Sequence, residues 1–349
     1  MAAENAVETC GLTKRFRGGP VAEDRFWAEA LVQEARRLLR PPELRTVVDD
    51  VSLSVRRGEF FGVIGSNGAG KTTFLKMLAC LLYPDAGGGR VDGHDLRRDR
   101  AGVRRSVAIA GAGGWLGMLW QLDGRENLLF RARMLGLPRT EAERRADEVL
   151  ERLGVAEKAR QHSLNWSAGE RQKMNLAMAF IGRAPVVMLD EPTSHLDPSV
   201  SREVREFVRE ELNRRNGQTV IMSTHYLEEA ELLCDRVAVF HRGRLLACDS
   251  PAALKRAHAP ARIVELRAVG YAPSVGERVR LRCGLAEVLA QFEDVATGAA
   301  RLRPKWANGA ADPDGLRQAL ESEGVRVTAV ANVPPTLDDV YFSLARSGP

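Results

Sequence analysis

Residues 65–72 read GSNGAGKT, in which glycines surround a lysine and a hydroxyl residue. Glycines let successive backbone N–H groups turn inward onto phosphate oxygens, and a following helix adds its N-terminal dipole. Such a loop places the lysine against the β and γ phosphates and the hydroxyl against Mg²⁺. A strand-like run precedes the motif and a helical pattern follows it, so a chance glycine turn is a poor alternative. We predict a nucleotide-binding loop formed by Gly65, Ser66, Asn67, Gly68, Ala69, Gly70, Lys71, Thr72 and Thr73.

A carboxylate pair follows a second buried strand. Four apolar residues, 186–189, precede Asp190 and Glu191. Asp190 at the strand end is suited to the metal side of a bound nucleotide, together with Thr72, and Glu191 can polarise a water molecule. Two merely solvated carboxylates would be the alternative, which the upstream loop makes weaker. A nucleotide and Mg²⁺ are therefore the expected ligands, with Glu191 as a catalytic residue; the resemblance described next implies that the nucleotide is ATP.

Five motifs in a fixed order carry a family resemblance: GSNGAGKTT, SAGERQ, VVMLDEP, SHLD and STH. The order resembles that of ATP-binding-cassette (ABC) transporter nucleotide-binding subunits, over residues from about 7 to 256. The resemblance implies a head-to-tail dimer, with each ATP held between one P-loop and the other subunit's Ser167, Gly169 and Glu170. It implies that Asp197 couples the two sites. It also implies that His225 is a catalytic switch residue on the γ-phosphate, although a lone histidine is more often structural.

Phe16 in LTKRF stands where this family places an aromatic residue that stacks on adenine. A core phenylalanine is the alternative, because a long insert follows at once.

The loop at residues 166–170 departs from the family pattern L-S-G-G-Q and reads Trp166-Ser167-Ala168-Gly169-Glu170. The serine and the second glycine, which would donate to a γ-phosphate, remain. Ala168 adds a methyl group, which is harmful only if that backbone needs a positive φ. Glu170 keeps an acceptor, loses an amide donor and adds a negative charge. We therefore expect a working ATPase, with turnover that is slower if the changes matter.

A second departure lies after the strand near residues 107–110. The family's glutamine is missing there, and Gln121 stands too close to RENL to replace it. The glycine-rich replacement, the motif GRENL, the insert after LTKRF and the tail PPTLDDVYFSLA resemble the ABC-2 exporter branch, which exports drugs, polyketides or polysaccharides. The resemblance implies an ATPase subunit that drives a separate transmembrane permease. A soluble, non-transport ABC ATPase is the alternative.

Strands alternating with helices predict an α/β fold with a largely parallel sheet. We place a nucleotide-binding domain at 1–256, with a helical subdomain at about 98–175, and a small C-terminal α+β domain at 262–349. Strands are expected over 47–65, helices over 71–82, 140–153 and 201–215, and a hairpin over 236–251. The tail is expected to run strand, strand or helix, helix, strand, helix. Thr336 and Asp339 resemble a capping box.

A helix is also expected at about 21–40, with Phe26, Trp27 and Leu31 on one apolar face. It could cover its own domain, or it could touch a membrane or a partner.

Composition narrows the other possibilities. The net charge is +5, without the clustered cations and aromatics of a nucleic-acid-binding module, so no nucleic-acid partner is expected. Five scattered cysteines argue against a disulfide framework or a zinc site. There is no signal-peptide pattern and no apolar run long enough to span a bilayer. We expect a peripheral protein at the cytoplasmic face of the cell membrane, with a second ATPase subunit, in a homodimer, and a permease as partners.

Overall fold

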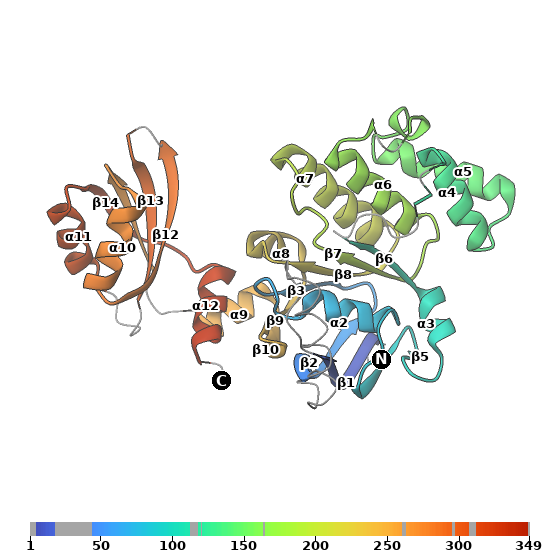
Figure 1. Cartoon of the computed structure of the whole chain (residues 1–349), viewed down its shortest axis with the longest axis horizontal. Helices are drawn as coiled ribbons and strands as arrows, with labels where there is room; N and C mark the ends of the chain where they lie inside the picture. Colours follow the sequence, from blue (N-terminus) through green and yellow to red (C-terminus); the bar gives the residue numbers. More distant parts are fainter. Residues whose placement is uncertain are drawn as a thin grey trace, which may run out of the picture. The chain divides into compact units, whose positions relative to one another are not determined.

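The computed structural model describes residues 5–17, 44–111, 118–119, 121–162, 165–259, 263–294, 297–306 and 312–347. The chain divides into two compact units, Met1–Pro251 and Ala252–Ser347 (Figure 1). Each unit has its own hydrophobic core. The fold is α/β, as predicted. The insert helix expected at 21–40 lies outside the described residues. Within the described ranges, no helix is both long and apolar enough to cross a membrane.

A six-stranded sheet forms the centre of the first unit, in the order β10-β9-β3-β8-β7-β6. Five strands are parallel, and β10 pairs antiparallel at the edge. The apolar runs in the sequence become buried strands because helices cover both faces of such a sheet. The strands are β3 (Phe60–Ile64), β6 (Val107–Gly111), β7 (Val186–Asp190), β8 (Thr219–Thr224), β9 (Arg236–His241) and β10 (Arg244–Asp249).

A four-stranded antiparallel sheet, in the order β2-β1-β4-β5, accompanies the central sheet. Its strands are β1 (Asn5–Arg17), β2 (Leu44–Arg56), β4 (Ala86–Val91) and β5 (His94–Asp95). The strand pattern at 47–65 is therefore two strands in two different sheets. Helix α2 (Lys71–Leu78) shares one core with both sheets, and its Phe74 contacts Phe240 of β9 at 5.2 Å between ring centroids. This shared core fixes the nucleotide-binding loop that precedes α2.

The remaining helical elements of the first unit are α3 (Arg100–Ser106), α4 (Gly124–Met134), α5 (Arg139–Arg152), η1 (Lys158–Arg160), α6 (Ala168–Phe180), α7 (Pro198–Glu206), η3 (Phe207–Arg215) and α8 (Leu227–Leu233). The charged helix expected at 201–215 is α7 continued by the π-helix η3. Helix α2 ends four residues before its predicted end, because Cys80 adopts a positive φ of 54°. The hairpin β9–β10 turns through Arg242 and Gly243, both with positive φ, as expected of a two-residue turn.

The second unit is an antiparallel sheet in the order β12-β13-β11-β14 with helices. Its elements are α9 (Pro251–His258), β11 (Val264–Val269), α10 (Pro273–Arg282), β12 (Leu285–Asp294), β13 (Ala299–Trp306), α11 (Pro313–Ser322), β14 (Arg326–Asn332) and α12 (Leu337–Ser347). The prediction of a single strand or helix between β11 and α11 was wrong, since a helix and two strands lie there. At the start of α12, Asp339 accepts hydrogen bonds from the Thr336 N–H (2.9 Å) and hydroxyl (3.0 Å). The contact resembles half of a capping box.

Candidate nucleotide site

The glycine-rich loop lines a cavity of 260 Å³ between β3 and α2, the P-loop cavity. Gly70 ends the loop with φ = 99°, and a Cβ there would lie 2.4 Å from the carbonyl oxygen of Val47. A residue with a side chain could not adopt this conformation without displacing β2. The cavity is lined by Val47, Asn67, Gly68, Ala69, Gly70, Lys71, Thr72, Thr73, Asp190 and Glu191.

Lys71 is almost fully buried at the base of this cavity, with 4% of its surface exposed. Its Nζ donates to the carbonyl oxygens of Gly65 (2.7 Å) and Ser66 (3.2 Å). Burial lowers the pKa of the Lys71 ammonium, an effect that the nearby carboxylates of Glu191 and Asp190 oppose. The Glu191 Oε1 lies 3.6 Å from Nζ. A buried ammonium held by two carbonyls and a carboxylate is a ready partner for an anionic group.

Asp190 ends β7 and Glu191 follows it, at the carboxyl end of the central sheet. The Asp190 Oδ1 accepts from the Thr72 hydroxyl at 3.0 Å and from the Ser223 hydroxyl at 2.5 Å. Ser223 lies on β8 directly opposite Asp190, so parallel pairing sets this contact. Sequence reasoning missed Ser223, although its position in STH, at the end of a buried strand, is a usable signal. Glu191 has a φ of 51°, a conformation that is uncommon outside glycine.

The Thr72–Asp190 pair suits a magnesium ion. A hydroxyl and a carboxylate oxygen are hard ligands, and Mg²⁺ usually takes one or two carboxylates, with water and substrate phosphates completing the shell. Among the described residues, no group of three or more His, Cys, Asp or Glu side chains could hold a metal. The pair therefore fits an ion that arrives with a phosphate ligand better than an all-protein metal cage.

His225 lies just beyond β8, next to the same carboxylate. Its Nδ1 is 3.2 Å from the Glu191 Oε1, but the alignment does not make a hydrogen bond. The ring packs on Tyr226 with centroids 4.1 Å apart. The fold thus gathers Lys71, Glu191 and His225 at one place.

Phe16 lies apart from the lining of the P-loop cavity, on β1 opposite Arg45 of β2. Its side chain is 39% exposed, with the Lys14 ammonium 5.4 Å from the ring centroid. The alternative of a core phenylalanine is therefore wrong. The ring lies on the strand pair that supplies Val47 to the cavity, and its stacking on adenine stays a prediction.

Ser167 begins α6 as its N-cap and forms a full capping box with Glu170. The Glu170 amide donates to the Ser167 hydroxyl oxygen (3.2 Å), and the Ser167 amide donates to the Glu170 carboxylate (2.8 Å). This backbone hydrogen bond is the main reason why the pKa of Glu170 is lowered, and Lys158 lies 3.6 Å from the carboxylate. The negative charge of Glu170 is thus stabilised by the N-terminus of its own helix and by Lys158. None of the cavity-lining residues comes from this loop.

The other changes in the loop also have local explanations. Ala168 begins α6 without a positive φ, so its methyl group strains nothing. Trp166 is buried, and its indole donates to the carbonyl oxygen of Lys158 at 3.0 Å. A Cβ on Gly124 of α4 would lie 2.9 Å from the Trp166 ring, so the glycine of GRENL makes room for this indole. Gln121 is exposed and does not line the P-loop cavity.

Asp197 is exposed and precedes α7, and its side chain makes no capping hydrogen bond there. Helix α7 then approaches α6, since a Cβ on Gly169 would lie 2.9 Å from Cγ1 of Val200. The sequence analysis missed a buried carboxylate, Glu229, which joins α8 to α7 and to the segment before it. Glu229 of α8 accepts from the Thr193 hydroxyl (2.8 Å) and pairs with Arg205 of α7 (2.9 Å).

Comparisons with known proteins agree with this geometry. Residues 48–194 match the family model described as ABC transporter. Daunorubicin resistance ATP-binding protein DrrA3 of Streptomyces coeruleorubidus is 36% identical over 303 residues, 86% of this chain and 91% of the relative. ABC transporter ATP-binding protein NatA of Bacillus subtilis (strain 168) is 35% identical over 212 residues, 61% of this chain and 85% of the relative. A solved dimeric ATP-binding cassette with bound ADP and phosphate is 22% identical, with a TM-score of 0.58, and the match covers 70% of this chain and 98% of that one.

These findings define the class of protein: the chain belongs to the ABC transporter family and is one of its ATP-binding, ATP-hydrolysing subunits. Within that class it is an ATPase subunit of the ABC-2 exporter type. None of the findings favours the alternative of a non-transport ATPase.

Proposed function

We propose that this chain hydrolyses ATP with the residues gathered at the P-loop cavity and thereby drives a separate permease. The observation that carries the assignment is that Lys71, Asp190 and Glu191 meet at one cavity behind the glycine loop. The loop amides and Lys71 hold the phosphates. Thr72 and Asp190 hold a magnesium ion, which supplies charge neutralisation on the phosphates when bound.

Glu191 takes the role of general base. Its carboxylate lies at the cavity wall, between Lys71 and His225, so it can orient a water molecule toward the terminal phosphate. His225, just beyond β8 and next to the Glu191 carboxylate, acts as the switch residue on the γ-phosphate. Phe16 supplies an exposed ring for the adenine base.

Two copies of the chain complete two sites. The dimeric state of the solved cassette supports this arrangement. So does the position of Ser167, Gly169 and Glu170, whose helix N-terminus lies outside the chain's own cavity. The Ser167 hydroxyl and the backbone amides at the start of α6 then act on the ATP of the other subunit, and Asp197 couples the two sites.

The permease partner is supported by relatives named as resistance ATP-binding proteins. An apolar surface on α4 also supports it: Phe130 is 45% exposed and Met134 is 69% exposed, one turn apart on the same helix. We assign this surface to permease contact, at the cytoplasmic face of the cell membrane.

Co-purification tests the assignment. The chain is expressed in its native host, and the membranes are solubilised in mild detergent. The purified chain should retain a polytopic membrane protein. It should also show ATPase activity that chelation of Mg²⁺ abolishes. A Phe130→Ser, Met134→Ser variant should lose the membrane protein and keep ATP binding. An ATPase that never co-purifies with a membrane protein would contradict the transport role.

A further inference from the structure

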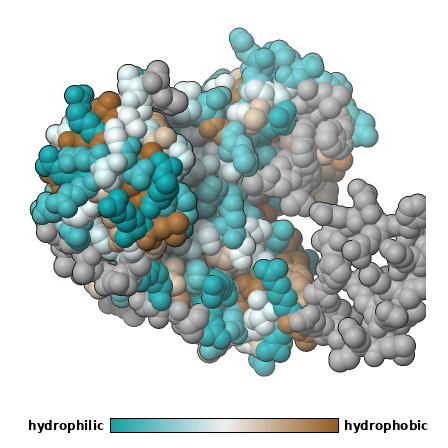
Figure 2. All heavy atoms as spheres, turned by 60° about the vertical axis from the view of Figure 1, so that its left-hand side comes forward, coloured by the Kyte–Doolittle hydropathy of each residue, from teal (hydrophilic) through white to brown (hydrophobic). Residues whose placement is uncertain are grey.

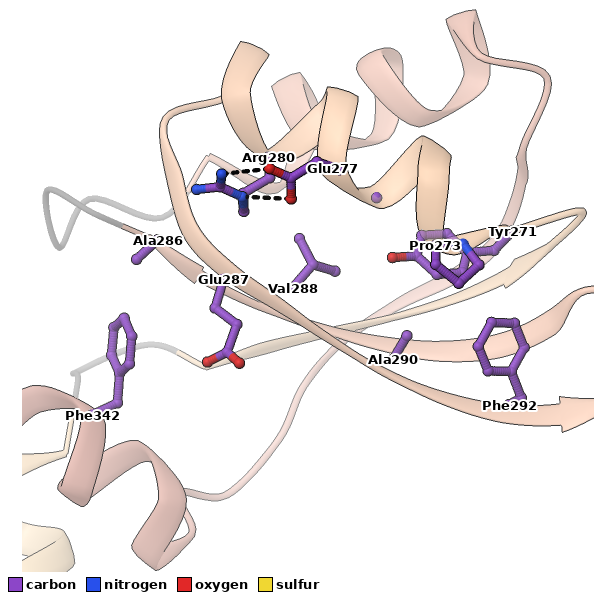
Figure 3. Close-up of a pocket in the computed structure, with 11 residues that line it drawn as sticks. Tyr271, Pro273, Glu277, Arg280, Ala286, Glu287, Val288, Ala290, Phe292 and Phe342 are labelled. Atoms are coloured by element: carbon purple, nitrogen blue, oxygen red, sulfur yellow. Dashed lines mark hydrogen bonds and ion pairs between the residues drawn. The ribbon is translucent and has the colours of Figure 1, made fainter. Parts of the chain in front are cut away.

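A groove of 560 Å³ lies along β12 in the C-terminal unit (Figure 3). Helix α10 forms one side of it through Gly276, Glu277 and Arg280. Arg280 donates to both carboxylate oxygens of Glu277, at 2.9 and 2.6 Å, so these two charges compensate each other. The volume falls within the range of ligand-binding sites. None of the nucleotide chemistry described above uses this groove.

The groove borders an open sheet edge. Strand β12 pairs with β13 on one side, and no described strand pairs with its other side. From Leu289 to Asp294 every residue of β12 is exposed. Figure 2, in which the C-terminal unit comes forward, shows hydrophobic residues among hydrophilic ones on its surface. A long edge with unpaired backbone N–H and C=O groups is a template for another strand.

Both faces of β12 contribute to the groove. Val288 and Phe292 lie on the side of α10, while Glu287 points to the opposite side of the ribbon, toward Phe342 of α12 (Figure 3). A compact ligand would meet one of these faces. An added strand projects successive side chains to alternate faces and would meet both, while its backbone pairs with the edge.

The charges on β12 indicate which kind of strand can add to it. The sequence of β12, LAEVLAQFED, holds three carboxylates and no cation. Glu293 is compensated by Arg301 at 2.8 Å. Lys305, opposite Glu287 on β13, is already paired with Asp339. Asp294 accepts a hydrogen bond from the Thr297 hydroxyl at 2.7 Å. Among the described residues no cation pairs with Glu287, which is therefore available to a cation of the incoming chain, whereas a second copy of the acidic β12 would bring like charges together.

We propose that an extended permease segment with alternating apolar and Lys or Arg residues adds to β12 as a further strand. The proposal rests on the permease partnership proposed above. Cytoplasmic segments of membrane proteins carry an excess of Lys and Arg, which is the chemistry that Glu287 recognises. On this proposal the C-terminal unit is a docking module for the permease.

A peptide probe tests the groove directly. A fluorescent heptapeptide of alternating lysine and valine, titrated with the full-length chain, should bind with a rise in anisotropy. The same peptide with prolines at its central valines should not bind, because it cannot donate to the edge. An analogue with glutamate in place of lysine should bind more weakly. Equal binding of all three peptides, or no binding by the first, would overturn strand addition at β12.

Variants locate the binding. Phe292→Glu should weaken the lysine–valine peptide about tenfold, whereas Val330→Glu on the opposite edge strand β14 should not. Phe292 and Val330 are similarly exposed, at 36% and 42%, so they form a matched pair. Glu287→Lys should weaken binding by about fivefold, and Glu321→Lys on α11 should leave it unchanged. If both variants of either pair lost the same peptide affinity, β12 would not be the binding site.

Co-purification then separates this proposal from the proposed function. The Phe292→Glu chain should retain less permease than the wild type and the Val330→Glu chain, with ATP binding unchanged. If the Phe292→Glu chain retains the permease fully, the strand that adds to β12 does not come from the permease. A wild-type chain that retains no membrane protein would contradict the proposed function, while the peptide result would still decide the groove.

Discussion

Lys71 shows how burial prepares a single residue for an anion. Its ammonium donates to the Gly65 and Ser66 carbonyls and faces Glu191, so the charge is already compensated before any phosphate arrives. Removing it takes away charge-assisted contacts worth roughly 1.5–3 kcal/mol each. Lys71→Ala should therefore weaken ATP binding by about 100-fold or more, as measured by isothermal titration calorimetry. Lys76→Ala, one turn further along α2, is the control and should bind ATP as the wild type does.

Glu191 holds its position through its backbone as well as its side chain. Its amide donates to the Ser223 carbonyl oxygen at 3.0 Å, and its carboxylate lies between Lys71 and His225. Glu191→Gln keeps this shape and removes the base. ATP should still bind, while steady-state turnover should fall by about 10²–10⁴-fold. A variant that hydrolyses ATP near the wild-type rate would show that another group is the base.

At the scale of whole elements, the contact between helices α6 and α7 positions the Ser167 loop. A Cβ on Gly169 would meet Cγ1 of Val200 at 2.9 Å, so Gly169→Ala must displace the Val200 side chain or push the two helices apart. Overpacking of this kind costs about 1–3 kcal/mol, and a small displacement of phosphate donors should lower turnover about tenfold. Val200→Ala removes the clashing methyl groups, so the double variant should recover most of the lost ATPase activity.

Ala168→Gly is the control for this experiment. Ala168 has no positive φ, so its methyl group can be removed without relieving strain. Turnover of that variant should stay within about twofold of wild type, because only helix propensity changes. Failure of the double variant to recover would mean that Gly169 acts through its backbone and not through its contact with Val200.

The same elements show what a sequence can predict. The glycine loop, the apolar run before Asp190 and the hairpin turn at Gly243 each follow from local chemistry, and the structure has them. The partners of those residues depend on pairing between distant strands: Ser223 meets Asp190 only because β7 and β8 lie side by side. Glu229 was missed for the same reason, since its contacts with Thr193 and Arg205 join separate elements. The capping of α6 by Glu170 is local, and its spacing of three residues from Ser167 is that of a capping box.

At the scale of the whole molecule, each unit has a core of its own, and the catalytic cavity of one chain lacks the Ser167 loop. A dimer would supply that loop in trans. Ser167→Arg should therefore abolish turnover while leaving nucleotide binding to the P-loop intact. Lost donors of this kind cost about 10²–10³ in rate, and the bulky cation adds obstruction.

A mixture of Ser167→Arg and Lys71→Ala chains tests the trans arrangement. In a mixed dimer, one site combines an intact Lys71 with an intact Ser167, and the other site carries both defects. Two inactive parents should therefore give a mixture with measurable ATPase activity, limited to one competent site in each mixed dimer. Mixing Ser167→Arg with itself at the same total concentration is the control, and it should stay inactive because every interface is spoiled. Normal hydrolysis by a monomeric Ser167→Arg chain would mean that the loop acts in its own subunit or not at all, and that the capping box of α6 serves only to hold the helix.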